Sequence, residues 1–212
     1  MTEILASDPA WKSNADLIAD VAALGWLNGR VLDLTHGEGV FWRRWQPDHL
    51  TTNDLHKPAD HNHDARHPLP PDWVGAYDAV VFDPPYKLNG TPTDDDRYGV
   101  DRKATMDERI DLITVGSARA AEAVAGGGWL HIKVQSQISG GRYRDQVGHV
   151  AGLFSDGAFR LRAVWYFVSR PRPQPAGRRQ VNPRNNVSQL LSFNRVAGPP
   201  DVAEHGEQLR LA

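Results

Sequence analysis

The sequence predicts an α/β fold: a doubly wound, mostly parallel seven-stranded sheet with helices on both faces. Two observations support this prediction. Short apolar runs alternate with segments of helical periodicity along the 212 residues, and such alternation is typical of parallel sheets covered by helices. Glycine-rich or acidic turns follow several of these runs, at the positions where open α/β sheets bind their ligands.

The first predicted elements are a helix over residues 8–25 and a buried strand over 30–34. Asp8 is a suitable N-cap, Pro9 suits the first helical position, and Gly25 can end the helix. Apolar side chains between these ends recur at helical spacing, so one face of the helix should pack on the sheet.

The later elements follow from the same patterns, because apolar runs of strand length predict strands and longer periodic segments predict helices. We expect a helix through residues 40–45, strands over 50–53, 77–82 and 129–134, helices over 107–125 and 142–154, and two closing strands over 159–168 and 187–193. Gly126, Gly127 and Gly128 should end the alanine-rich helix that precedes them.

The length is sufficient for one domain with a single core. We expect this domain to span residues 1–196, with loop insertions at 87–106 and 170–186 that are rich in proline, glycine and polar residues. Loops of that length are uncommon in compact domains unless they are functional or disordered. Residues 197–212 are predicted to be a weakly ordered tail.

Composition excludes several kinds of chemistry. The chain has no cysteine, so it has neither disulfides nor thiolate zinc sites, and no mechanism can use a cysteine nucleophile. No apolar run is long enough to cross a membrane, and the first residues do not resemble a secretory signal, so we expect a cytoplasmic protein that does not interact with membranes. The histidines of residues 56–67 are expected to be solvated, with no metal bound.

The stretch Asp83-Pro84-Pro85-Tyr86 is the strongest functional signal, because it directly follows the apolar run that ends at Phe82. The two prolines fix two φ angles and remove two N–H donors. The stretch is therefore a stiff arm with a carboxylate before it and an aromatic ring after it. This combination suits an amino group on a flat ring, whose hydrogens a carboxylate and a backbone carbonyl can accept.

This stretch resembles the catalytic motif of the class I S-adenosylmethionine-dependent amino-methyltransferases of the Asp-Pro-Pro-Tyr type, in particular the DNA adenine N6 methyltransferases. The resemblance covers residues 28–135 well and the rest by topology only. It implies a Rossmann-like methyltransferase domain, S-adenosyl-L-methionine as the cofactor, and Asp83, Pro84, Pro85 and Tyr86 as the catalytic residues.

The first strand leads into a second stretch that resembles this family. An acid followed by glycines is the first motif of class I methyltransferases, although Thr35 occupies the position of the first glycine here and the usual aromatic residue is absent. The resemblance implies that Asp54 holds the ribose and that an acid at the end of the third strand holds the adenine. The expected cofactor-binding residues are Asp33, Thr35, Gly37, Gly39, Asp54, Asp64 and Ala65.

An arginine-rich stretch is the best candidate for binding nucleic acid. Arginines separated by prolines stay extended and solvated, which suits contacts with phosphates. The expected nucleic-acid-binding residues are Lys87, Arg170, Arg172, Arg178, Arg179 and Arg184. The chain has no room for a full sequence-reading domain, so a specificity partner subunit or a homodimer is a further expectation.

Three functions therefore remain open. The leading one is methylation of adenine N6 in DNA, which the resemblance implies, with DNA expected as the partner more than RNA. The second is methylation of an amino group of guanine or adenine in ribosomal RNA. The third is a catalytically inactive methyltransferase fold that serves as a binding subunit, which the intact Asp83 and Tyr86 disfavour.

Overall fold

A computed structural model describes residues 11–86, 106–155, 157–169 and 185–196 of the chain. Their main sheet has six strands in the order β2-β1-β3-β4-β8-β7. The strands are β1 (Arg30–Asp33), β2 (His49–Thr52), β3 (Tyr77–Phe82), β4 (Val124–Val134), β7 (Phe159–Val168) and β8 (Val187–Arg195). The first four strands pair in parallel, and β8 pairs antiparallel with both β4 and β7. The predicted mostly parallel, doubly wound sheet is thus confirmed.

The expected number of seven strands is wrong. The missing strand is the third, which should have preceded Asp64. Only an isolated parallel bridge between Asn53 and His61 forms there, with two backbone hydrogen bonds of 3.1 Å beside it. Residues 55–63 contain almost no large apolar side chain, so a strand in this segment would have little to bury.

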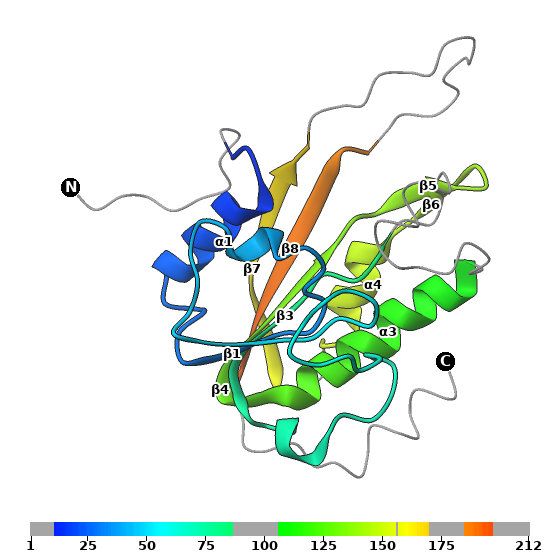
Figure 1. The fold of residues 1–212 in the computed structure, drawn as a ribbon. Helices are drawn as coiled ribbons and strands as arrows, with labels where there is room; N and C mark the ends of the chain where they lie inside the picture. The colour runs from blue at the N-terminus through cyan, green and yellow to red at the C-terminus, as the bar shows by residue number, and fades with distance from the viewer. Residues whose placement is uncertain (1–10, 87–105, 156, 170–184, 197–212) are drawn as a thin grey trace.

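Helices cover both faces of the sheet, as predicted (Figure 1). Helix α1 (Asn14–Ala23) lies on one face, and α3 (Met106–Ala123) and α4 (Gln146–Gly152) lie on the other. Side chains of the central strands alternate between the two layers, as the two-residue period of a strand requires. In β3, Ala79 and Val81 pack with α1, whereas Val80 and Phe82 pack with α3.

Near the N-terminus, two helices begin or end at other residues than the sequence predicts. Helix α1 is capped by Ser13, whose N–H and hydroxyl both donate to the Asp16 carboxylate; the predicted cap, Asp8, lies outside the described residues. The helix expected through residues 40–45 is only a single 3-10 turn, η1 (Val40–Trp42). Pro47 follows closely, and a proline disfavours helical backbone in the residue before it.

The segment after β4 also differs from expectation. Residues 142–154 were predicted as one helix, but they contain β6 (Arg142–Arg144) and then α4, which Asp145 caps by accepting a hydrogen bond from the Gly148 N–H at 2.9 Å. β6 pairs with β5 (Gln137–Ser139) in a hairpin separate from the main sheet. Gly140 and Gly141 both have positive φ and form its turn, which a purely helical interpretation overlooked.

The three glycines at 126–128 do not form a loop after α3. They lie inside β4, which begins at Val124 directly after the helix. Gly127 has φ of +79°, and the pairing of β3 with β4 shifts register between Tyr77 and Ala79. The glycines therefore form a bulge, a usual role of glycine inside a strand. In the part of the chain that the structure describes, no helix has the length and apolar character needed to span a bilayer.

Candidate active site

The carboxyl ends of β1, β2 and β3 meet at one edge of the sheet. β1 lies between the other two strands, and all three run parallel. Backbone hydrogen bonds extend the pairing into the loops: the Leu34 N–H donates to the Val81 carbonyl at 2.9 Å, and the His36 N–H donates to the Asn53 carbonyl at 2.8 Å. β2 lies on one side of β1 and β3 lies on the other, so the strand order reverses at β1. Open α/β sheets bind their ligands at such a point.

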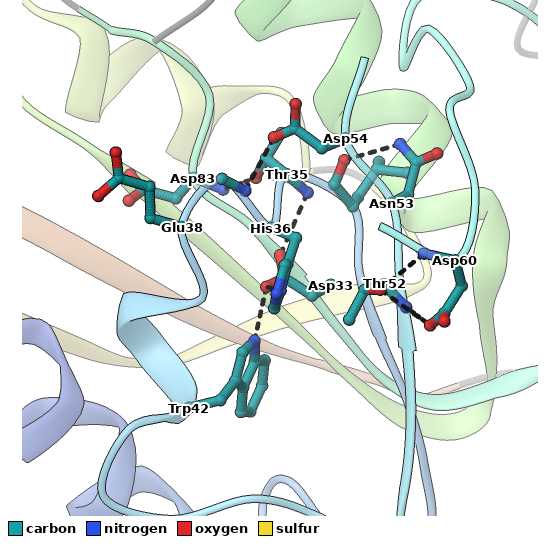
Figure 2. A network of polar contacts seen from close by, with 12 residues as sticks. Asp33, Thr35, His36, Glu38, Trp42, Thr52, Asn53, Asp54, Asp60 and Asp83 are labelled. Atoms are coloured by element: carbon teal, nitrogen blue, oxygen red, sulfur yellow. Dashed lines mark hydrogen bonds and ion pairs between the residues drawn. The ribbon is translucent and has the colours of Figure 1, made fainter. Parts of the chain in front are cut away.

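Asp33 holds the loop of residues 34–39, the glycine loop, in place through hydrogen bonds (Figure 2). Its side chain is almost fully buried and accepts three hydrogen bonds: from the Thr35 N–H at 3.1 Å, from Trp42 Nε1 at 2.6 Å and from His36 Nδ1 at 3.1 Å. The Asp33 carboxylate raises the pKa of His36 through this contact. Asp33 therefore fixes the loop and η1 together, and little of its carboxylate is left for a ligand.

Thr35 links the glycine loop to the Asp-Pro-Pro-Tyr motif. Its hydroxyl oxygen accepts a hydrogen bond from the Asp83 N–H at 2.7 Å, across 48 positions of sequence. A glycine at this position would have no side chain to make this contact. Thr35, which departs from the family pattern, therefore links the predicted cofactor-binding loop to the predicted catalytic motif by a hydrogen bond.

Asp54 fixes the far side of the glycine loop. Its Oδ2 accepts from the Gly37 N–H at 2.8 Å, and its Oδ1 accepts from the N–H groups of His56 and Lys57 at 2.9 and 2.7 Å. Gly37 and Gly39 have φ of +59° and +65°, values that side chains disfavour. A carboxylate offers about four acceptor positions, so Asp54 retains capacity for one further donor.

Asp83 stands at the end of β3 beside a buried lysine. Its Oδ1 is buried and accepts no hydrogen bond from any described residue, but it lies 3.5 Å from Lys133 Nζ of β4. Burial raises the pKa of Asp83, the Asp33 carboxylate raises it further, and Lys133 opposes both effects. The Asp83 side chain as a whole remains 24% exposed, although Oδ1 itself is buried.

Tyr86 is fixed from two sides. Its hydroxyl accepts from Lys133 Nζ at 3.2 Å, and the lysine nitrogen also lies 5.1 Å from the centre of its ring. Its carbonyl accepts from the amides of Gln137 and Gln146 at 2.9 and 3.0 Å. The motif therefore leaves β3 along a constrained path, and its aromatic ring is positioned rather than free to rotate.

Asp64 lies in the loop that replaces the third strand. Its carboxylate receives the Arg66 guanidinium through Nη2 at 2.7 Å and Nε at 3.0 Å, and the hydrogen bonds from Arg66 lower the pKa of Asp64 to about 2. Ala65 is buried in the core beside α3. Whether either residue binds a ligand stays a prediction.

The predicted nucleic-acid-binding residues are not described by the structure. Lys87, Arg170, Arg172, Arg178, Arg179 and Arg184 all lie outside the described residues, as do most of the two predicted loop insertions and the tail. Within the described ranges, no three histidine, aspartate or glutamate side chains are grouped so that they could hold a metal ion.

Sequence reasoning missed the residues that complete the site from β4 and beyond. Lys133, Gln137 and Gln146 contact the motif but stand 47, 51 and 60 positions away from Tyr86. One signal could have found Lys133: a charged residue inside an apolar strand pattern is almost never buried unless it has a partner. The two glutamines carry no comparable signal.

Comparisons with known proteins establish the fold. No family model matches the sequence, and no curated protein matches it. TrmN from Thermus thermophilus superposes with a TM-score of 0.53 at 14% identity, covering 88% of this chain and 51% of that one. The chain thus spans about half the length of TrmN.

Two further structures match over most of both chains. The N-methyltransferase NodS from Bradyrhizobium japonicum WM9 has a TM-score of 0.52 at 12% identity, covering 86% of this chain and 94% of its own. A protein from work on the conversion of a disulfide bond into a thioacetal group in echinomycin biosynthesis has a TM-score of 0.51 at 14% identity. The match covers 92% of this chain and 88% of that one. The chain therefore has the Rossmann-like fold of the class I methyltransferases, with six strands in its main sheet.

Proposed function

We propose that this protein transfers a methyl group from S-adenosyl-L-methionine to the exocyclic amino nitrogen of a nucleic-acid base, namely N6 of adenine in DNA. The observation that carries the proposal is the Asp83 carboxylate. It is partly exposed at the carboxyl end of β3, its Oδ1 accepts no hydrogen bond from a described residue, and the stiff Pro84-Pro85 arm follows it. A carboxylate with one unsatisfied oxygen and a partly exposed side chain suits an N–H donor of a ligand in this setting.

The site residues have distinct tasks in this reaction. The amino nitrogen of adenine is a poor nucleophile because its lone pair is delocalised into the ring. When Asp83 and the Pro84 carbonyl accept hydrogen bonds from its two N–H groups, the nitrogen moves toward sp³ geometry and its lone pair becomes available. The nitrogen loses one of these protons after it has received the methyl group. Fixed placement of the reacting atoms then supplies much of the rate, and the Lys133 ion pair and the Thr35 contact provide that placement for Asp83.

Tyr86 is proposed to stack on the target base. A base inside a duplex cannot enter such a site, so the target must be flipped out or already single-stranded. Stacking on an aromatic ring is worth about 1–3 kcal/mol per base. The contacts of Lys133 and the two glutamines with Tyr86 support this role, because they hold the residue in place before the base arrives.

The residues at the ends of β1 and β2 fit S-adenosyl-L-methionine, which supplies an electrophilic methyl group when bound. Asp33, Asp54 and Asp83 place three carboxylates at this edge, and Glu38 of the glycine loop is exposed. This charge suits a cationic ligand and opposes a phosphate. Asp54 retains acceptor capacity for a ribose hydroxyl, whereas Asp33 is proposed to act mainly by holding the loop of Gly37 and Gly39.

Labelling experiments separate the possible substrates. The protein is incubated with methyl-labelled S-adenosylmethionine and either unmethylated DNA or total RNA, and the labelled nucleoside is identified by mass. We expect label on N6 of adenine in DNA. Label in RNA alone would move the assignment to an RNA amino-methyltransferase. No label in either, with cofactor binding intact, would favour a binding subunit or a catalyst that requires a partner.

Asp83→Asn tests the role of the carboxylate, and Asp72→Asn is the matched control because Asp72 is an exposed acid on η2 (Pro71–Trp73). Asp83→Asn should lower the methylation rate about 100-fold or more, in the range of a lost acid or base group, while calorimetry still detects S-adenosylhomocysteine binding. Asp54→Ala should instead weaken that binding. Unchanged transfer by Asp83→Asn would contradict the proposal.

A further inference from the structure

A short hairpin stands apart from the main sheet beside the candidate active site. β5 and β6 pair antiparallel with each other and with no strand of the six-stranded sheet. β5 begins soon after β4 ends. Because β4 runs parallel to β3, the hairpin leaves the sheet at the same edge at which Asp83 lies. In Figure 1 it extends away from the sheet, above α4 and the first turns of α3.

The hairpin has the side chains of a nucleic-acid contact. Tyr143 is 65% exposed, more than any other large apolar side chain of the described residues. Arg142 before it is exposed, and the Nε of Arg144 after it is buried without a described hydrogen-bond partner. The hairpin contains no acid. The next acid, Asp145, already accepts hydrogen bonds from Ser136 Oγ and the Gly148 N–H.

The two faces of the hairpin differ in chemistry. In the observed register, Gln137 pairs with Arg144 and Ser139 pairs with Arg142, while Ile138 pairs with Tyr143. Because successive side chains of a strand point to opposite faces, both arginines share a face with Gln137, and Tyr143 lies on the other face. Gln137 donates to the Tyr86 carbonyl at 2.9 Å, so the arginine face adjoins the catalytic motif.

We propose that this hairpin binds the single strand of nucleic acid that carries the target base, an inference that rests on the proposed function. Arg142 and Arg144 contact phosphates near the target on the face that adjoins the motif, and Tyr143, on the other face, stacks on an unpaired base further along the same strand. Single-stranded nucleic acid is recognised by this combination of positive charge along the backbone and aromatic rings against the bases. In this way the hairpin holds the substrate strand beside the motif.

Oligonucleotide binding tests the proposal. The full chain, saturated with S-adenosylhomocysteine, is titrated into a fluorescent adenine-containing single-stranded DNA or RNA, and anisotropy gives the Kd at several salt concentrations. Tyr143→Ala should raise the Kd about tenfold, within the range for one lost stacking contact, whereas Tyr143→Phe should keep it. Arg142→Ala/Arg144→Ala should lower the slope of log K against log salt by about 1.4, or about 0.7 per phosphate on a single strand.

The chain offers matched controls at the start of β7, away from the site edge. Leu161→Ala removes an apolar side chain that is 45% exposed, and Arg160→Ala/Arg162→Ala removes two exposed arginines. These variants should leave both the Kd and the salt slope unchanged. Equal losses in the hairpin and control variants, or no loss in the hairpin variants, would overturn the inference.

The same data distinguish the inference from the proposed function. If the oligonucleotide binds through the hairpin but no base is methylated, the proposed function fails and the hairpin contact stands. If a base is methylated and the hairpin variants keep the wild-type Kd and KM, the inference fails and the proposed function stands. If wild-type protein neither binds nor methylates DNA or RNA, both fail. The DNA and RNA titrations show which nucleic acid the hairpin prefers.

Discussion

Trp42 shows how a single side chain supports the glycine loop. Its indole N–H donates to the buried Asp33 carboxylate at 2.6 Å. Trp42→Phe keeps most of the aromatic packing and removes this donor, so we expect a loss of about 1–3 kcal/mol in the free energy of unfolding, since a hydrogen bond to a charged buried group is lost. Urea denaturation measures the loss.

Trp45→Phe is the matched control, because Trp45 packs beside Trp42 with ring centres 6.4 Å apart and its indole donates to no described group. We expect its effect on the free energy of unfolding to be clearly smaller. Equal losses in the two variants would mean that packing, rather than the hydrogen bond to Asp33, stabilises this part of the loop.

Lys133 should set the acid side of the pH profile of methyl transfer. The groups that face Asp83 are the Lys133 ammonium, the Asp33 carboxylate and the Tyr86 hydroxyl that bonds the same lysine. Lys133 lowers the pKa of Asp83 against burial, so Lys133→Met should raise that pKa. The acid limb of kcat/KM against pH should then move to higher pH, whereas Lys133→Arg should leave it near its original position. A shift toward lower pH in Lys133→Met would contradict this role.

At the residue scale, the sequence predicted positions better than it predicted contacts. Asp83, Tyr86, Asp33 and Gly37 lie after strands that the sequence predicted, and their roles in binding and catalysis stay predictions. The Thr35 link to Asp83 was not found, because a hydroxyl that meets an N–H 48 positions away leaves no local pattern. The sequence showed Thr35 only as a departure from the family motif, whereas the structure shows that its hydroxyl accepts a hydrogen bond from the Asp83 N–H.

At the scale of elements, α3 depends on one glycine for its distance from β3. A Cβ at Gly116 would lie 2.4 Å from the Phe82 ring, and Phe82 directly precedes Asp83. Gly116→Ala gains helix propensity of up to about 1 kcal/mol, but the clash should outweigh it, since overpacking typically costs about 1–3 kcal/mol. We expect a lower Tm and slower methyl transfer.

Gly152→Ala in α4 is the control for this substitution, because no atom lies within 4 Å of a Cβ placed there. Its Tm should stay unchanged or rise. A rise in Tm for Gly116→Ala as well would mean that Phe82 can rotate away without cost. In that case the close approach of α3 to β3 would not be what positions Asp83.

Elements were predictable where one period dominates the sequence. The strand over residues 77–82 is confirmed at both ends because four successive buried residues leave one interpretation. The helix predicted over residues 142–154 includes β6, and no element was predicted at β5, because strands of only three residues each cannot show a period. The third strand was expected from the family pattern alone, and the polar segment 55–63 does not form it.

At the scale of the whole molecule, the two layers of core enclose a buried polar group, His131 of β4. Its side chain is fully buried. Its Nδ1 lies 2.9 Å from Ser192 Oγ, and its Nε2 lies 3.1 Å from the Trp26 carbonyl. Burial lowers the pKa of His131 to about 4 from its ordinary value of 6.5. The folded state therefore requires the neutral imidazole, and stability becomes linked to pH.

The sign of this linkage follows from the direction of the shift. Above pH 6.5 the imidazole is neutral in both the folded and the unfolded state, and its full contribution to the free energy of unfolding is present. As the pH falls from 6.5 to 4, only the unfolded chain takes up the proton, so stability is lost. The shift corresponds to at most about 3 kcal/mol. Asp64, with a pKa lowered to about 2 from its ordinary value of 3.8, loses its contribution to stability only at lower pH, between these two values.

Comparison of wild type with His131→Gln isolates this effect. Gln has no group that titrates, so the free energy of unfolding of the variant should fall less than that of wild type between pH 6.5 and 4. The raised pKa of Asp83 acts in the opposite direction, because its contribution is lost as pH rises, but it is common to both proteins and cancels in the difference. His49→Gln, at an exposed position of β2, should keep the wild-type slope. Equal slopes for wild type and His131→Gln would show that the two layers open enough to hydrate His131, and that the core is looser at β4 than its burial implies.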